Sequence, residues 1–182
     1  MSLVDSSSGD RRYSEHKRLN LLILLSSEIS NGPEPHLFAL VIGINDYMHY
    51  DKLAGAVPDA QAFTKYLTTS LNVPEKRIKM LINEEATRKE IIENLIDLSY
   101  LDAIAVGDPV VIFYAGHGGE ALAPPVWAAG GPGSITQMII PQDSTNGPEI
   151  PGIPDRTVIG LLNKIAASKG NNIVGLCQDP ED

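Results

Sequence analysis

The chain has little cysteine: Cys177 is the only one among 182 residues. A single cysteine excludes an intrachain disulfide and a cysteine-rich metal cluster. A protein without disulfides is expected in a reducing compartment, so we predict a cytoplasmic location. In such a compartment a lone cysteine is also a candidate nucleophile if the fold brings a histidine to it.

Basic residues are scarce relative to acidic ones. The chain carries 14 Lys and Arg against 23 Asp and Glu, which gives a formal net charge of −9 at pH 7. This surplus of negative charge argues against nucleic acid or an anionic membrane surface as the main partner. It is compatible with a basic substrate and also with an acidic surface that is simply solvated.

Long apolar runs are absent from the N-terminal region. The run at residues 19–25 is far shorter than the roughly 20 residues that span a bilayer, so we expect a short amphipathic or buried helix there. It would belong to an N-terminal extension and linker, residues 1–35. Hydrophobic residues make up 43% of the chain, enough for one globular domain, which we place at residues 36–182.

Strand and helix patterns alternate through that domain. The run at 37–44 is continuously apolar, which is typical of a parallel strand buried on both faces. Shorter, mainly apolar runs at 78–82, 109–114 and 172–176 predict three more strands. A shorter strand is expected at 137–141, after an irregular loop at 120–134. The order predicts an α/β fold with a mostly parallel central sheet.

Helical spacing of apolar residues fills the intervals between these strands. One helix is expected between about residues 57 and 71. Thr87 and Glu90 have the spacing of a capping box and predict the start of a second helix. Asp155 is expected to cap a third helix, which Gly170 ends.

The segment Gly116-His117-Gly118-Gly119 directly follows the third apolar run. Its small residues leave the imidazole uncrowded and let a substrate backbone approach closely. In parallel sheets, ligands bind beyond the carboxyl ends of the strands, where we place His117 and, after the first and last strands, Asn45, Asp46 and Cys177. Because imidazole exchanges its proton near neutral pH, His117 is a candidate general base or acid. The alternative is a turn histidine that only binds the backbone.

Five segments resemble the caspase-like cysteine peptidases, most closely their metacaspase branch: residues 39–45, 53–60, 113–119, 140–143 and 153–157. They occur in the order of that family. The resemblance implies a caspase-like three-layer sandwich, of which this chain would hold the large-subunit half. It also implies a cysteine-type endopeptidase that acts on polypeptides without a cofactor, cuts after Arg or Lys if metacaspase-like, and has a role in programmed cell death.

The same resemblance assigns roles to particular residues. His117 would handle the protons, and the backbone N–H of Gly118 would stabilise the oxyanion. Asp59 matches an acidic residue that lines a pocket for a basic side chain; alternatively, it only favours a helix N-terminus. The segment 121–134 contains no acidic residue, so we predict no calcium or other metal site there.

Cys177 follows an apolar run and is the candidate nucleophile, but its surroundings depart from the family pattern. It comes about three residues too early after Asn171-Asn172-Ile173 and lacks the His-Ser-Gly sequel, and Gly175 is expected to interrupt its strand. We therefore expect a truncated chain or gene model that diverges after Ile173. Such a chain would leave a hydrophobic sheet edge, open to self-association or to the missing small-subunit segment.

Three functions therefore compete. The first is an active caspase-like endopeptidase, and the second is a catalytically inactive caspase-like domain that binds or regulates other proteins. The third is an unrelated doubly wound domain for a nucleotide or small ligand. Against the third, Gly43-Ile44-Asn45-Asp46 is not the glycine-rich phosphate loop that such domains place after their first strand.

Overall fold

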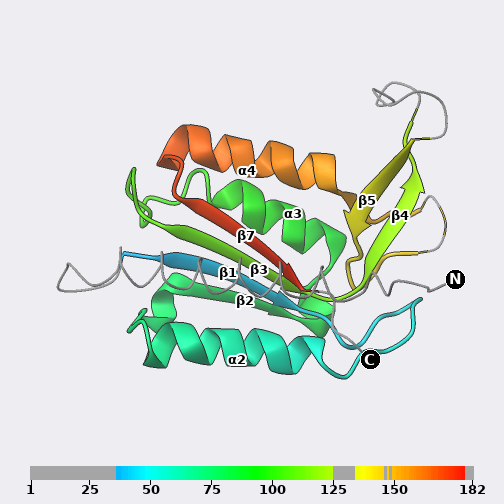
Figure 1. The fold of residues 1–182 in the computed structure, drawn as a ribbon, viewed down its shortest axis with the longest axis horizontal. Helices are drawn as coiled ribbons and strands as arrows, with labels where there is room; N and C mark the ends of the chain where they lie inside the picture. The colour runs from blue at the N-terminus through cyan, green and yellow to red at the C-terminus, as the bar shows by residue number, and fades with distance from the viewer. Residues whose placement is uncertain (1–35, 125–133, 146, 148, 179–182) are drawn as a thin grey trace, which may run out of the picture. The chain divides into compact units, whose positions relative to one another are not determined.

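A computed structural model describes residues 36–124, 134–145, 147 and 149–178 (Figure 1). Its central sheet is parallel and has the strand order β2-β1-β3-β7. The strands are β1 Phe38–Gly43, β2 Ile78–Ile82, β3 Val110–Ala115 and β7 Ile173–Gln178. These are the four apolar runs that the sequence predicts as strands, and the predicted α/β class is confirmed.

Three helices cover the two faces of this sheet (Figure 1). Helix α2, Ala56–Thr69, packs on one face, where Phe63 stacks on Phe113 of β3 with ring centroids 4.5 Å apart. Helices α3, Arg88–Asp97, and α4, Asp155–Lys169, cover the other face and bury Ile91 and Ile165 in the same apolar cluster as Ile112 of β3. The predicted three-layer arrangement is therefore confirmed.

Strands β1 and β3 form the centre of the sheet. Every residue of both strands is buried, because each strand has a neighbour on both sides and helices on both faces. Single 3-10 turns, Glu75–Arg77 and Asn83–Glu85, precede and follow β2. The carboxyl ends of β1 and β3 consequently lie side by side in the buried centre of the domain.

A second, antiparallel sheet follows β3 and corrects two predictions. Its order is β4-β5-β6, with β4 at Gly118–Leu122, β5 at Ile135–Ile139 and β6 at Ile153–Pro154. The predicted loop at 120–134 is therefore wrong at its start, and the predicted strand at 137–141 begins two residues earlier. Glycines give β4 little strand propensity of its own, so pairing with β5 decides its conformation.

The ends of the helices agree with the sequence in part. The Thr87 side chain accepts the Glu90 N–H of α3 at 3.2 Å, which confirms Thr87 as the N-cap. Asp155 is not a cap, because Pro154 occupies that position and Asp155 is the first residue of α4. Gly170 ends α4 with φ of 99°, a backbone conformation that glycine adopts without strain.

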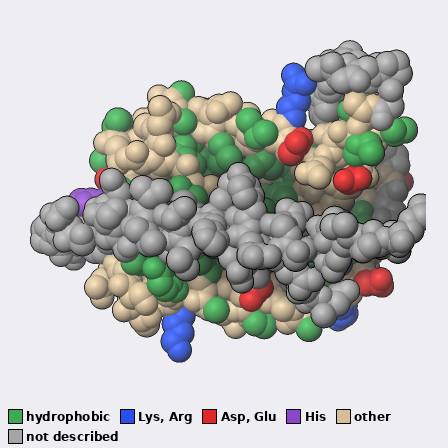
Figure 2. All heavy atoms as spheres, viewed as in Figure 1, with side chains coloured by type: hydrophobic (Ala, Val, Ile, Leu, Met, Phe, Trp, Pro, Cys, Tyr) green, Lys and Arg blue, Asp and Glu red, His purple; other side chains and the backbone are tan. Residues whose placement is uncertain are grey.

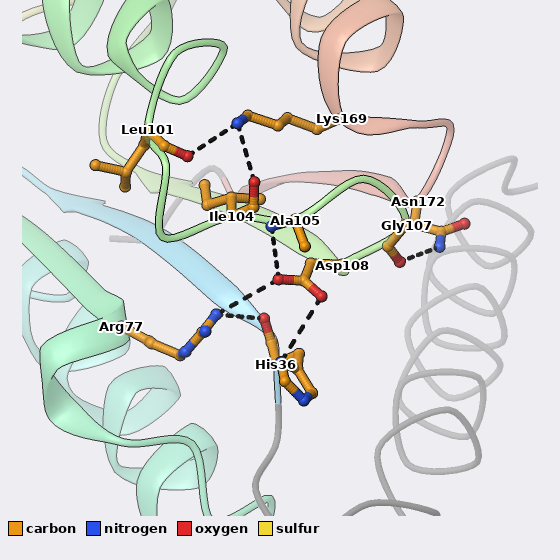
Figure 3. A network of polar contacts seen from close by, with 9 residues as sticks. All are labelled: His36, Arg77, Leu101, Ile104, Ala105, Gly107, Asp108, Lys169 and Asn172. Carbon is orange, nitrogen blue, oxygen red and sulfur yellow. Dashed lines mark hydrogen bonds and ion pairs between the residues drawn. The ribbon is translucent and has the colours of Figure 1, made fainter.

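The start of β7 is fastened to the chain that precedes β3 (Figure 3). The Lys169 ammonium donates to the carbonyls of Leu101 and Ile104, each at 2.9 Å. The Asn172 amide donates to the carbonyl of Gly107 at 2.7 Å, while the Gly107 N–H donates to the carbonyl of Lys169, also at 2.7 Å. These bonds fix where β7 begins relative to β3.

Some predictions fall on other parts of the chain. The N-terminal extension, with its predicted helix at residues 19–25, lies outside the described residues, and so does most of the segment 121–134. The domain boundary at residue 36 therefore stays a prediction. Among the helices that the structure describes, none combines the length and the apolar character needed to cross a membrane.

Candidate functional site

The candidate site lies beyond the carboxyl ends of β1 and β3. His117 comes two residues after the end of β3, and Asn45 and Asp46 come two and three residues after the end of β1. The Ile44 N–H donates to the Ala115 carbonyl at 3.0 Å and keeps the two chain segments together past the last ladder pair. The sequence-based placement of these three residues at one edge of the sheet is confirmed.

The His117 imidazole is anchored to the loop that follows β1. Its Nε2 lies 2.9 Å from the backbone carbonyl oxygen of Asp51. A carbonyl can only accept a hydrogen bond, so Nε2 carries the proton in this contact. The lone pair of the neutral ring is then on Nδ1, and Nδ1 is the atom that can take up a proton from a reacting group.

The backbone of His117 is held as firmly as its side chain. Its N–H donates to the Tyr47 hydroxyl at 2.7 Å. Its carbonyl accepts the Ile140 N–H at 3.0 Å and the Tyr114 hydroxyl at 2.9 Å. Together with the bond to Asp51, four hydrogen bonds from three segments of the chain fix this one residue: the loop after β1, β3 and the chain after β5.

Tyr47 and Tyr114 form a buried pair beneath His117. They are 6% and 3% exposed, and their hydroxyl oxygens are 3.5 Å apart. Burial raises the pKa of Tyr114 well above its ordinary value, and Tyr47 and Cys177 nearby raise it further. Tyr114 therefore stays protonated and remains a donor at neutral pH.

Gly116 is required by these two hydroxyls. A Cβ atom at this position would lie 2.5 Å from the Tyr47 oxygen and 2.7 Å from the Tyr114 oxygen. The sequence suggests that the small residues around His117 make room for a substrate. At Gly116 this space is occupied by the hydroxyl groups of Tyr47 and Tyr114.

The backbone N–H of Gly118 points away from the second sheet. Gly118 lies opposite Ile139 in the β4–β5 ladder. The Ile140 N–H donates to the His117 carbonyl, so this hydrogen bond joins the residues directly next to that pair. Gly118 and Ile139 therefore form a non-hydrogen-bonded pair, in which the N–H groups face away from the partner strand. Gly118 is exposed, so its N–H can be reached by an incoming carbonyl oxygen.

The loop after β1 is shaped by two asparagines, of which sequence reasoning assigns Asn45 to the site but not Asn83. Asn83, after β2, accepts the N–H groups of Asn45 and Asp46 on its side-chain oxygen, at 2.9 and 3.1 Å. Asn45 in turn accepts the Val57 N–H at the start of α2, at 3.1 Å. Asn83 lies just past β2 and has a positive φ of 48°, a conformation that asparagine adopts more readily than most residues. The sequence alone does not reveal this backbone angle, so it does not predict the role of Asn83.

The acidic residues near this edge are spread over separate elements. The Asp46 carboxylate pairs with Lys52 at 2.8 Å, and Asp143 accepts the Arg88 N–H at the start of α3 at 2.7 Å. Asp59 is half-buried in the first turn of α2, where the helix dipole favours its charge. Within the described ranges, no three His, Cys, Asp or Glu side chains are grouped to hold a metal ion.

Cys177 lies inside β7 and not beyond its end. The strand continues through Gly175, which pairs with Ile112, so the predicted interruption is wrong. Cys177 is exposed and pairs with Tyr114, and Gln178 still pairs with Ala115. The ladder with β3 supplies the backbone hydrogen bonds that carry the strand past the glycine.

Cys177 opens into a pocket between α4, β7 and the β4–β5 hairpin. The pocket has a volume of about 540 Å³, and its lining includes Gly118, Asp155, Val158 and Cys177. Apolar side chains gather between α4 and the hairpin, with acidic side chains close by (Figure 2). The structure therefore brings together two of the predicted site residues, Gly118 and Cys177.

His117 and Cys177 are offset along the sheet. Cys177 is level with Tyr114, three residues before His117, which corresponds to about 10 Å of extended strand. The imidazole is anchored on the β1 side of β3 through Asp51, whereas β7 lies on the opposite side of β3. His117 is not among the residues that line the described pocket at Cys177.

Comparison with known proteins agrees with this architecture. The family model described as the caspase domain matches residues 36–148, which include Asp59, His117 and Gly118 and end before Cys177. The crystal structure of protein GSU0716 from Geobacter sulfurreducens has a similar fold, with a TM-score of 0.57 and 21% identity over 81% of this chain. This chain spans 50% of that protein's length. A search of the curated proteins gave no match.

Proposed function

Since the chain belongs to the caspase domain family of peptidases, we propose that it forms a cysteine-type endopeptidase site in which His117 transfers the protons. The observation that supports this role most directly is the hydrogen bond from Nε2 to the Asp51 carbonyl at 2.9 Å. This bond leaves the lone pair on Nδ1, so Nδ1 is the ring atom that can act as a base.

Cys177 is the nucleophile in this proposal, because it is the only cysteine in the chain. The Cys177 thiol gives its proton to Nδ1 of His117, and the resulting thiolate sulfur forms a bond to the scissile carbonyl carbon. The carbonyl electron pair moves onto the oxygen, where the Gly118 N–H stabilises the charge. Protonated His117 then gives its proton to the leaving amine as the C–N bond breaks. In the second half, water loses a proton to His117 and its oxygen bonds to the acyl carbon of the thioester. The C–S bond then breaks, and Cys177 leaves as the thiolate and takes the proton back from His117.

The proposed substrate class rests on Asp59, to which the family resemblance assigns a pocket for a basic side chain. In that role its carboxylate would pair with a basic side chain before the cut, bidentately with Arg, which fits cleavage after Arg or Lys and the metacaspase branch of the family. The acidic net charge of −9 is consistent with basic substrates. A cytoplasmic role in programmed cell death follows from the family resemblance alone and is part of the same proposal.

The offset of Cys177 favours a second candidate function. A nucleophile and its base act within hydrogen-bond reach of each other, about 2.6–3.2 Å, and Cys177 is level with Tyr114 and not with His117. A caspase-like domain with this register would bind polypeptides or regulate a related enzyme without cleaving. In that case the pocket beside Gly118 and Cys177 is a binding surface.

The outer side of β7 supports the expected association with another polypeptide. Within the described sheet β7 is an edge strand, and its sequence, Ile-Val-Gly-Leu-Cys-Gln, carries no charge. An uncharged edge readily accepts a further strand. We propose that this strand comes from a small-subunit segment or from a second copy, and sedimentation over a range of concentrations distinguishes the two.

Cleavage of peptide amides by matched variants tests the proposed function. The substrates carry Arg, Lys or Leu before the scissile bond, and the proteins are the unaltered chain, His117→Ala, Cys177→Ala and, as control, His49→Ala at an exposed loop histidine. Loss of cleavage in the first two variants, with His49→Ala active, supports the dyad. Equal cleavage by all four proteins refutes it.

A further result separates the two candidate functions. If the unaltered chain is folded and binds the Arg peptide without cutting it, the non-catalytic function holds. If it cuts, Asp59→Asn is expected to raise KM for the Arg and Lys peptides and leave the Leu peptide unchanged. An equal effect on all three peptides would remove Asp59 from the specificity pocket.

A further inference from the structure

Two tyrosines hold the peptide groups on either side of His117. The Tyr47 hydroxyl accepts the His117 N–H at 2.7 Å, and the Tyr114 hydroxyl donates to the His117 carbonyl at 2.9 Å. We propose that Tyr47 and Tyr114 are positioning residues, which together fix the imidazole of His117 and aim the N–H of Gly118. Their importance for catalysis rests on the proposed function, but the geometric effect does not.

Tyr114 acts on Gly118 through a shared peptide group. The peptide bond between His117 and Gly118 is planar and trans, so its carbonyl and its N–H point in opposite directions. Because the carbonyl is held towards Tyr114 and Ile140, the Gly118 N–H is held pointing away from them. Two hydrogen bonds to one carbonyl also polarise the peptide, which strengthens its N–H as a donor.

Tyr47 acts on the imidazole. Besides accepting the His117 N–H, its ring packs against the imidazole with centroids 4.8 Å apart and the planes tilted by 45°. Tyr47 and Asp51 belong to the same loop after β1, so that loop binds the backbone of His117 at one end and Nε2 at the other. Two fixed points on one residue restrict the χ angles of the side chain between them.

The hydroxyl protons of the pair have a defined direction. The Tyr114 proton is directed to the carbonyls of His117 and Ile140, both at 2.9 Å and both able only to accept. In the 3.5 Å contact between the hydroxyls, the proton therefore comes from Tyr47. The absence of a side chain at Gly116 lets the two oxygens approach the turn together.

Nuclear magnetic resonance of the ¹⁵N-labelled full chain tests this proposal without depending on activity. Tyr47→Phe is expected to speed hydrogen exchange of the His117 amide about tenfold and to mix the two ring tautomers, where the unaltered chain shows Nε2–H. Tyr114→Phe is expected to shift the Gly118 amide nitrogen upfield, since its peptide carbonyl loses a donor. The matched control is Tyr50→Phe, because the Tyr50 ring is 6.2 Å from His117 but its hydroxyl bonds Thr145.

The outcomes separate this proposal from the proposed function. Unchanged His117 and Gly118 signals in both variants, or equal changes in Tyr50→Phe, overturn the positioning role whether or not the chain cleaves peptides. If the chain cleaves, kcat is expected to fall about tenfold in both variants with little change in KM. If it does not cleave, the proposed function fails and the spectra still decide the positioning role; should Tyr114→Phe not fold, Tyr47→Phe alone decides it.

Discussion

Replacement of Tyr114 by phenylalanine tests how the buried hydroxyl stabilises the edge of the sheet. At neutral pH the variant loses the donor to the His117 carbonyl, which keeps the Ile140 N–H, and the donor to the Ile140 carbonyl. Ile140 is 3% exposed, so its carbonyl loses a partner in a place that is poorly hydrated. We expect the free energy of unfolding to fall by about 1–3 kcal/mol.

The stabilisation by the Tyr114 hydroxyl decreases as the pH rises. Burial raises the pKa of Tyr114 in the folded protein well above the ordinary value of 10.0, so above pH 10 the unfolded chain releases the proton first. The folded state then binds more protons than the unfolded state, and stability falls as pH rises, by up to about 1.4 kcal/mol per pH unit. The contribution of the hydroxyl is complete below pH 10 and is lost between 10 and the pKa of the folded state.

Urea unfolding of the two proteins from pH 7 to pH 11, followed by circular dichroism, measures this difference. The phenylalanine variant is less stable at pH 7, and the gap between the two curves narrows above pH 10, because only the unaltered chain must deprotonate Tyr114. Repulsion within the acidic chain acts on both proteins and cancels in the difference. A gap that stays constant up to pH 11 would refute the argument.

Three further substitutions test other parts of the fold. Gly116→Ala is expected to cost about 1–3 kcal/mol, because a Cβ would lie 2.5 Å from the Tyr47 oxygen; a melting temperature equal to that of the unaltered chain would contradict this. Gly175→Ala is expected to stabilise the protein by about 0.5–1 kcal/mol, since among the described residues its Cβ would come close only to Leu162, at 3.8 Å, and a lower urea midpoint would count against it. Thr87→Ala removes the cap of α3 and is expected to cost about 1 kcal/mol, with Thr87→Ser as the variant that keeps it.

The central sheet could be predicted because its strands carry their own signal. Fully buried strands such as β1 and β3 are recognised in the sequence as apolar runs. The threonine that caps α3 is recognised from the residues next to it. The second sheet could not be predicted in this way. β4 consists of Gly-Gly-Glu-Ala-Leu, whose conformation is set by its partner β5, thirteen residues further along the chain.

The candidate site could likewise be predicted from the sequence only in part. His117 could be placed from sequence because it follows a buried run within a glycine motif. Its supports could not, since Tyr47, Asp51 and Ile140 reach it from segments 66–70 residues before it and 23 residues after it. Contacts over such separations depend on the assembled fold and leave no local pattern.

The register of β7 decides which residues the site can use. To bring Cys177 level with His117, β7 would have to slide by three residues, and an odd shift turns every side chain of a strand to the other face of the sheet. The bonds from Lys169 and Asn172 to the chain before β3 oppose such a slide at the start of the strand (Figure 3). The Val110 N–H also donates to the Asn172 carbonyl at 2.8 Å, which ties the first rung of the ladder to the same residue. Catalysis by the proposed pair would therefore require the 45–51 loop and His117 to approach β7, because β7 is held in its register.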